Sequence, residues 1–352
     1  MELKDSSSSS SRPVAIWMYT GVFMLLIQFV LGGVTRLTGS GLSITEWNVL
    51  SGSLPPLNHA QWLETFEKYR QTPQFRILNP DFSLSDFKFI FFWEFTHRLW
   101  ARLVGVVFLI GFVYFIWKKK LSRDMIRPMI ILFILGGLQG AVGWIMVASG
   151  LTGDAIYVLP TKLALHFVFA CGLILYTFWF ALILSVRPQD RGARSSKPLT
   201  IAILIILFLQ LTYGALMAGH KAATIAPTWP DINGQAIPAG LFSGHSLSEI
   251  LLGNTITVQF IHRTFAYLLI LLVAIWTCKA CKISQPNPLW RKFRNWPIIL
   301  ILIQALLGIT SLLTSPGIVP NHWVLFNWLA EFHQIVGLLF LLTITGMLYL
   351  EG

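Results

Sequence analysis

The chain has 352 residues, of which 55% are hydrophobic and only 12% are charged, and its formal net charge is +11 at pH 7. This composition excludes an ordinary soluble domain. The positive charge does not indicate a nucleic-acid partner, because the basic residues lie in short segments between long apolar runs. We therefore interpret the chain as an integral membrane protein with no nucleic-acid partner.

Eight apolar runs are long enough to cross a bilayer as helices, since the hydrocarbon core takes about 20 residues per helix. None of them alternates with a period of two, which would be typical of a membrane β-barrel. The sequence thus predicts an all-α membrane protein with eight transmembrane helices. The expected spans are residues 14–35, 89–117, 126–148, 160–186, 199–219, 256–278, 296–315 and 323–350.

The basic residues predict how the helices are oriented. They gather in three of the connecting segments, at 118–127, 187–197 and 279–294. The positive-inside rule places these segments, and with them both termini, on the cytoplasmic side. The polar N-terminus fits neither a mitochondrial transit peptide nor a cleaved signal. We expect a multi-pass protein of a bacterial inner membrane, in preference to a mitochondrial one.

A long outer loop, residues 37–88, follows the first helix. Within it, Asn58 and Gln61 have the spacing of a helix cap. The aromatic residues that follow recur along one helical face, and they are Trp62, Phe66 and Tyr69. We predict a short helix here, which either lies on the membrane, covers a site or forms a packed outer cap.

One motif occurs twice. The segment Glu94-Phe95-Thr96-His97-Arg98 near the outer end of one helix returns as Gln259-Phe260-Ile261-His262-Arg263. Each copy is followed by a second histidine in a later apolar run, His166 in the first case and His333 in the second. The chain therefore reads as one four-helix unit written twice.

Because each copy has an even number of helices, the two copies have the same orientation, and we predict two tandem, like-oriented four-helix bundles. Gln139 and Gln304 correspond across the copies and either one is a possible cofactor contact, while Gly136 and Gly140 form a small face for close helix packing. The predicted division is a polar N-terminus at 1–13, a first half at 14–186, a basic linker at 187–198 and a second half at 199–350.

The four histidines carry the functional argument. A single imidazole inside a bilayer is often only a hydrogen-bonded structural residue. Four of them at one depth on alternating helices favour two metal centres with paired axial imidazoles, which is how helix bundles hold haem. Zinc would require further carboxylate or thiolate ligands. We predict that one pair is His97 with His166 and the other is His262 with His333.

The two halves differ at one position beside these histidines. Glu94 precedes His97 by three residues, so the two side chains share a helix face, and the corresponding residue in the second half is Gln259. An acid inside a membrane is costly, which predicts chemistry in the first half and a passive cofactor in the second. The alternative is that Glu94 only pairs with Arg98. Arg98 and Arg263 are candidates for binding haem propionates, or else they reach the interface by snorkelling.

The three cysteines are Cys171, Cys278 and Cys281. A lone Cys-x-x-Cys pair that faces a reducing compartment is weak support for redox or metal chemistry. We favour apolar packing for all three thiols.

Together these residues resemble the haem A synthase family, in the form with a long first outer loop. The matching pieces are Gly32–Ser43 with Glu46-Trp47, Glu94-x-x-His97-Arg98, His166, His262-Arg263 and His333. Some members carry a cysteine pair in the outer loop, and residues 37–88 contain none.

The resemblance implies oxidation of the C8 methyl group of haem O to a formyl group by successive hydroxylations, which gives haem A for terminal oxidases. It also implies that His262 and His333 hold a haem b cofactor, that His97 and His166 face the substrate haem, and that Glu94 is catalytic. Haem O synthase and oxidase assembly factors are then possible partners, and the sequence does not reveal the electron acceptor.

Two other functions remain open from the sequence. A two-haem electron carrier of the cytochrome b kind would use all four histidines as permanent ligands. A non-catalytic haem transporter or chaperone would have no need of Glu94.

Overall fold

The computed structural model describes residues 12–46, 51–192, 196–283, 287–319 and 322–352, so most of the predicted polar N-terminus and Trp47 lie outside the described residues. Within those ranges it contains eight helices that are long and apolar enough to cross a membrane. Each predicted span lies on one of them, which confirms an all-α membrane protein. They are α1 (Arg12–Leu37), α4 (Leu84–Trp117), α5 (Arg123–Ala148), α6 (Pro160–Ser185), α7 (Lys197–Gly219), α8 (Thr255–Cys281), α10 (Trp296–Thr314, preceded by the short α9, Pro288–Phe293) and α11 (Leu325–Glu351).

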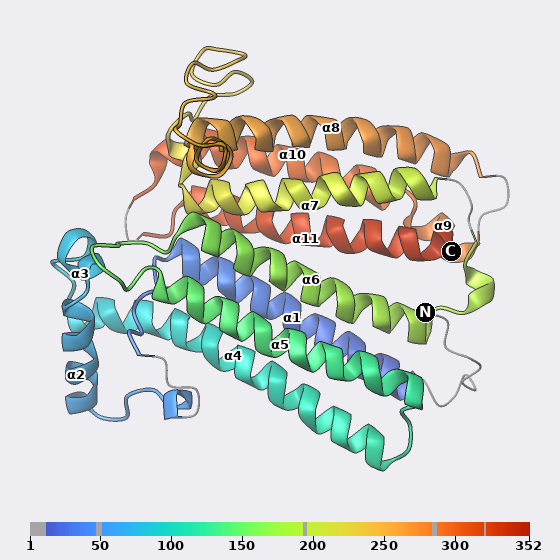
Figure 1. Ribbon diagram of the computed structural model, residues 1–352, viewed down its shortest axis with the longest axis horizontal. Coiled ribbons are helices and arrows are strands. Elements are labelled where there is room, and N and C mark those ends of the chain that lie inside the picture. Colours follow the sequence, from blue (N-terminus) through green and yellow to red (C-terminus); the bar gives the residue numbers. More distant parts are fainter. Residues whose placement is uncertain (1–11, 47–50, 193–195, 284–286, 320–321) are drawn as a thin grey trace.

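The long helices form two groups that lie against each other (Figure 1). Helices α1, α4, α5 and α6 make up one group, and α7, α8, α10 and α11 make up the other. The groups meet where α6 packs on α7 and α11, and where α1 packs on α11.

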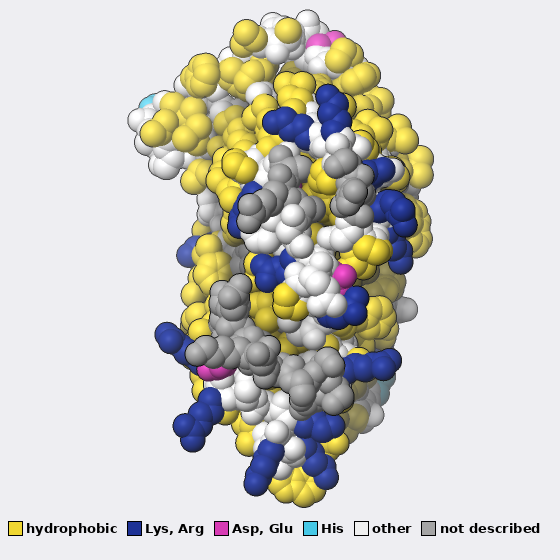
Figure 2. All heavy atoms as spheres, turned by 90° about the vertical axis from the view of Figure 1, so that its right-hand side faces the viewer, with side chains coloured by type: hydrophobic (Ala, Val, Ile, Leu, Met, Phe, Trp, Pro, Cys, Tyr) yellow, Lys and Arg dark blue, Asp and Glu magenta, His cyan; other side chains and the backbone are white. Residues whose placement is uncertain are grey.

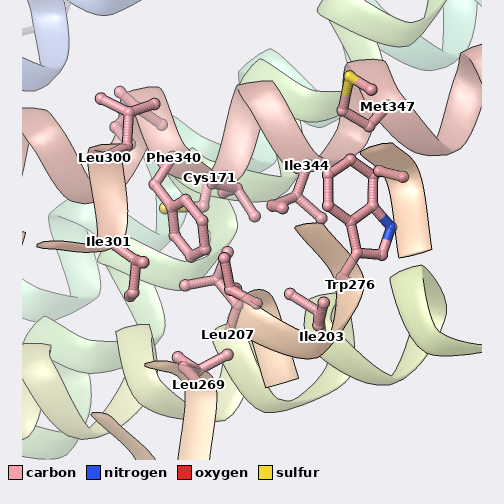
Figure 3. Close-up of a cluster of buried hydrophobic side chains, with 14 of the residues drawn as sticks. Cys171, Ile203, Leu207, Leu269, Trp276, Leu300, Ile301, Phe340, Ile344 and Met347 are labelled. Atoms are coloured by element: carbon pink, nitrogen blue, oxygen red, sulfur yellow. The ribbon is translucent and has the colours of Figure 1, made fainter. Parts of the chain in front are cut away.

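A hydrophobic cluster fills the second group and extends into the first (Figure 3). Its centre includes the fully buried Trp276 of α8, whose Nε1 donates a hydrogen bond to Oγ1 of Thr200 on α7 at 2.7 Å. Phe29 of α1 and Cys171 of α6 belong to the same cluster. This cluster therefore reaches across the junction of the two groups, while a separate cluster of residues from α1, α4, α5 and α6 fills the first group.

The cysteine prediction holds in part. Cys171 is buried in the shared cluster, which confirms apolar packing for this thiol. Cys278 and Cys281, at the end of α8, are exposed free thiols, so the packing predicted for them is wrong. Their spacing places them on the last turn of the helix, where the neighbouring helices no longer cover them.

Lysine and arginine side chains gather at the end of the molecule where α1 begins and α11 ends (Figure 2). The segments that join α4 to α5, α6 to α7, and α8 to α9 reach this same end (Figure 1). The charge is therefore segregated in space as the sequence predicts. The assignment of this end to the cytoplasm stays a prediction.

The outer loop forms the predicted short helix, α2 (His59–Arg70). Asn58 caps it by accepting a hydrogen bond from the amide of Gln61 at 2.9 Å. Its aromatic face packs on α4, with ring centroids 5.0 Å apart for Trp62 and Phe91 and 5.1 Å apart for Phe66 and Phe87. Of the three alternatives for this helix, the contacts correspond to a packed outer cap.

A second short helix, α3 (Pro73–Leu78), completes this cap. Burial raises the pKa of the Tyr69 hydroxyl to about 12. The hydroxyl therefore keeps its proton and donates to Oε1 of Gln74 at 3.1 Å. Nε2 of Gln74 in turn donates to the carbonyl of Gly39 at 3.4 Å, which ties the cap to the segment after α1.

We predict that Gly219→Ala destabilises the junction of the two groups. A methyl group on Gly219 of α7 would lie 2.8 Å from Cα and Cβ of Pro160 at the start of α6, and these rigid atoms have no rotamer to change. The free energy of unfolding should fall by about 1–3 kcal/mol, as for other overpacked sites. Thermal unfolding in detergent measures this change.

Gly172→Ala in α6 is the control, because a methyl group there meets no atom within 4 Å. This variant should be as stable as the wild type or up to about 1 kcal/mol more stable, since alanine favours the helix over glycine. Equal destabilisation by both substitutions would contradict the predicted clash.

Candidate functional site

A single cavity of about 1360 Å³ is lined by residues of all eight long helices. This volume exceeds the roughly 300–1,000 Å³ of a typical small-molecule site. The structure brings the four predicted histidines together on its wall, each from a different helix: His97 from α4, His166 from α6, His262 from α8 and His333 from α11.

The two histidines of the second half lie close together. The ring centroids of His262 and His333 are 6.4 Å apart, and the ring planes make an angle of 72°. An imidazole nitrogen lies about 2.0–2.1 Å from a bound metal such as zinc. Adding roughly 1 Å from each nitrogen to its ring centre gives a centroid separation of about 6 Å. The observed spacing therefore leaves room for one metal ion between the two rings. Haem binding by this pair stays a prediction.

The first-half pair lies in the same cavity with different neighbours. Nε2 of Gln28 on α1 is 3.2 Å from both ring nitrogens of His97. Nε2 of Gln139 on α5 is 3.2 Å from Nδ1 of His166. Both rings therefore have polar contacts within the bundle, as intramembrane histidines require.

The Glu94 carboxylate lies on the cavity wall with only 2% of its residue surface exposed. Its Oε2 accepts hydrogen bonds from Oγ of Ser43 at 2.7 Å and from the amide of Ile44 at 2.8 Å. Its Oε1 accepts one from Nη2 of Arg98 at 2.6 Å. The carboxylate thus fastens the start of the outer loop to α4, one turn away from His97.

Gln259 has the corresponding role in the second half. Its side chain is fully buried and Nε2 donates to the carbonyl of Ala226, in the segment after α7, at 3.0 Å. Arg263 donates to three carbonyls of that segment: Asp231 at 2.7 Å, Thr228 at 2.8 Å and Ala226 at 3.3 Å. Each half therefore anchors its outer segment in the same way, but only the first half uses a carboxylate.

The hydrogen bonds give the two arginines a structural role that the sequence did not predict. Arg98 also donates to the carbonyls of Ile44 at 3.2 Å and Glu46 at 3.3 Å. Both Arg98 and Arg263 line the cavity. The expected ion pair of Glu94 with Arg98 is present, and binding of haem propionates by the two arginines stays a prediction.

The packing role predicted for Gly136 and Gly140 is wrong. A methyl group on either residue would meet no atom within 4 Å, and both glycines line the cavity. Their missing side chains enlarge the cavity beside His166 and do not bring two helices into contact.

Sequence reasoning missed three polar residues of this region. Gln28 and Gln210 line the cavity, and Nε2 of Gln210 lies 3.4 Å from Nε2 of His262. Glu331 is buried two residues before His333, and neither carboxylate oxygen has a hydrogen-bond partner among the described residues. All three could have been found from the sequence, because each is an acid or an amide inside an apolar run.

Comparison with known proteins identifies relatives of this architecture. The sequence pattern of the family described as cytochrome oxidase assembly protein matches residues 15–345. A protein named heme A synthase from Flavobacterium psychrophilum is 39% identical over 352 residues, which cover 97% of this chain and 98% of the relative.

Two further proteins of the same name show similar agreement. The one from Bradyrhizobium diazoefficiens is 40% identical over 310 residues, covering 88% of this chain and 85% of its own. The one from Brucella suis is 41% identical over 305 residues, covering 86% and 84%. The chain belongs to the haem A synthase family, within the cytochrome oxidase assembly proteins.

Proposed function

We propose that this protein is a haem A synthase, an oxidoreductase that converts the C8 methyl group of haem O into the formyl group of haem A by successive hydroxylations. Family membership supports this proposal, because relatives that match most of the chain carry that name. The cavity supports it as well, since its size and its two histidine pairs suit two tetrapyrroles.

The two halves have different roles in this proposal. His262 and His333 would hold haem b through its iron, and their centroid spacing of 6.4 Å supports this role. Haem b, when bound, supplies one-electron transfer beside the substrate. His97 and His166 face the substrate haem from α4 and α6, and the apolar wall of the cavity excludes bulk water from it.

The observation that carries the assignment is the acid three residues before the histidine-arginine pair of the first half, which the second half replaces with an amide. Each hydroxylation breaks a C–H bond of the methyl group, forms a C–O bond and releases two electrons, which leave toward an electron acceptor. It also releases protons, so a base within hydrogen-bond reach assists it. Glu94 opens onto the cavity beside His97, whereas the second half has the amide of Gln259 at the corresponding place. The donors from Ser43, Ile44 and Arg98 orient the carboxylate.

The membrane setting follows from the same comparison. Eight apolar helices and bacterial relatives support a multi-pass inner-membrane protein. We assign the basic end in Figure 2 to the cytoplasm. The histidine cavity then opens toward the outer leaflet, where haem O and haem A enter and leave. Haem O synthase and oxidase assembly factors are the partners that this position suits.

We predict that Glu94→Gln abolishes haem A formation while it leaves the haem b spectrum intact. The amide still accepts hydrogen bonds from Ser43 and Ile44 but does not take up a proton, and loss of a general base costs roughly 10²–10⁴-fold in rate. Pigment extraction from cells that also express a haem O source measures the ratio of haem A to haem O.

Ser43→Ala is the matched control, because it removes one hydrogen bond to the carboxylate and keeps the acid. Its haem A formation should fall by at most roughly 10- to 150-fold, since a hydrogen bond to a charged group contributes about 1.5–3 kcal/mol, and it should stay above that of Glu94→Gln because the acid is kept. Haem A production by Glu94→Gln at the wild-type level would remove Glu94 from catalysis.

We also predict that the two histidine pairs respond differently to alanine. His262→Ala or His333→Ala should lower the amount of tightly bound haem by more than about tenfold. Even substitution of a residue that only orients a metal ligand lowers metal affinity 10- to 100-fold. His97→Ala or His166→Ala should keep that haem and lose haem A formation. Haem content per protein and pigment analysis report the two effects separately.

The same measurements distinguish the two-haem electron carrier from the synthase. A carrier would hold two haems permanently, and each of the four substitutions would remove one of them. Wild-type protein with two tight haems and no haem A formation would therefore replace the proposed function with that alternative.

A further inference from the structure

Four histidines each lie against a glutamine and a glycine of a neighbouring helix, and they are His97, His166, His262 and His333. In every case the glycine follows the glutamine by four residues, so both lie on one helix face. This Gln-x-x-x-Gly spacing occurs on each long helix that lacks a cavity histidine. The segments are Gln28–Gly32 on α1, Gln139–Gly143 on α5, Gln210–Gly214 on α7 and Gln304–Gly308 on α10.

The glycines let the imidazole rings lie against bare helix backbone. A methyl group on Gly143 or Gly308 would lie 2.9 Å from Cε1 of His166 or His333, respectively. At Gly32 and Gly214 the corresponding distance to the adjacent histidine is 3.2 Å. These values are below the about 3.5–4.0 Å of a favourable carbon contact. A larger residue at any of the four positions would therefore displace its histidine.

The contact between α10 and α11 shows what this close approach permits. Nδ1 of His333 lies 3.0 Å from the backbone carbonyl oxygen of Gln304, which accepts its hydrogen. A proton on Nδ1 makes Nε2 the acceptor of the ring. In this structure Nε2 of Gln304 lies 3.4 Å from that atom, and a metal ion at Nε2 would replace this contact. Gly308 lies one turn after Gln304 on the same helix face. Because it has no side chain, the imidazole ring of His333 comes close enough to reach the carbonyl of Gln304.

The glutamine side chains have an unused acceptor in the same place. The Oε1 atoms of Gln28, Gln139, Gln210 and Gln304 are all buried and have no hydrogen-bond partner among the described residues. A buried polar atom left without a partner costs roughly 1–3 kcal/mol. A carboxamide exchanges its oxygen and nitrogen by half a turn about its last bond. Each glutamine is therefore able to turn an acceptor oxygen toward its histidine.

We propose that each Gln-x-x-x-Gly segment positions one iron-facing histidine. The glycine admits the ring to the helix surface, and the glutamine supplies an oxygen, from its backbone or its carboxamide, for the ring N–H that points away from iron. A histidine that ligates a metal almost always donates its other ring N–H to such an acceptor, which fixes the ring and raises its basicity. The inference rests on the proposed function, since it requires haem between the histidines.

The experiment uses the full-length protein purified with its haem, and it tests the glycine and the carboxamide separately. Gly308→Ala should speed the transfer of haem to excess apomyoglobin 10- to 100-fold, which is the loss of metal affinity found when residues that orient a metal ligand are changed. Gln210→Leu should raise the midpoint potential of the retained haem, because His262 loses an acceptor and becomes a weaker donor to iron. Gln210→Glu keeps an oxygen acceptor and should restore or lower the potential.

Gly346→Ala is the matched control on the same helix as His333. A methyl group on Gly346 would lie 3.9 Å from its nearest neighbours, two ring carbons of Phe178, and Gly346 is not among the residues that line the cavity. Its haem transfer rate and midpoint potential should equal those of the wild type.

Two outcomes separate the possible failures. Wild-type protein that carries haem, with wild-type transfer rate and potential in both Gly308→Ala and Gln210→Leu, would overturn this inference alone. Wild-type protein without tightly bound haem would overturn the proposed function on which the inference rests.

Discussion

A polar side chain inside a bilayer has no water to satisfy it, so it must find its partners within the protein. In this chain that constraint collects the histidines of four helices, the glutamines of the Gln-x-x-x-Gly segments and Glu94 on the wall of one cavity. The surrounding helices present apolar faces to lipid and to the shared core of Figure 3. The location of the polar residues, and with it the candidate site, therefore follows from the medium in which the helices fold.

Much of this arrangement was predictable from the sequence, because long apolar runs and internal duplication are strong signals. The eight helices, the cap at Asn58 and the convergence of His97, His166, His262 and His333 were expected and are present. The predictions that failed concern the packing of Gly136 and Gly140 and the burial of Cys278 and Cys281. Whether Gly136 faces a helix or a cavity depends on the rotation of α5, and the spacing of residues does not determine that rotation.

The difference between Glu94 and Gln259 shows how duplication separates structure from chemistry. Both side chains fasten an outer segment to the helix that carries the histidine-arginine pair, so an amide is sufficient for that task. Anchoring therefore does not explain why the first copy has a carboxylate at this position. The sequence revealed the asymmetry, but the shared anchoring role became visible only from the hydrogen bonds.

The apolar cluster that joins the two groups of helices has a consequence for the two halves of the chain. Phe29 and Cys171 of the first group pack into the core of the second, across the contacts of α6 with α7 and α11. A lone four-helix unit would leave this seam uncovered. Such a unit on its own would be expected to pair with an identical copy through a two-fold axis, and one polypeptide that contains both units keeps this contact while its two halves are free to differ.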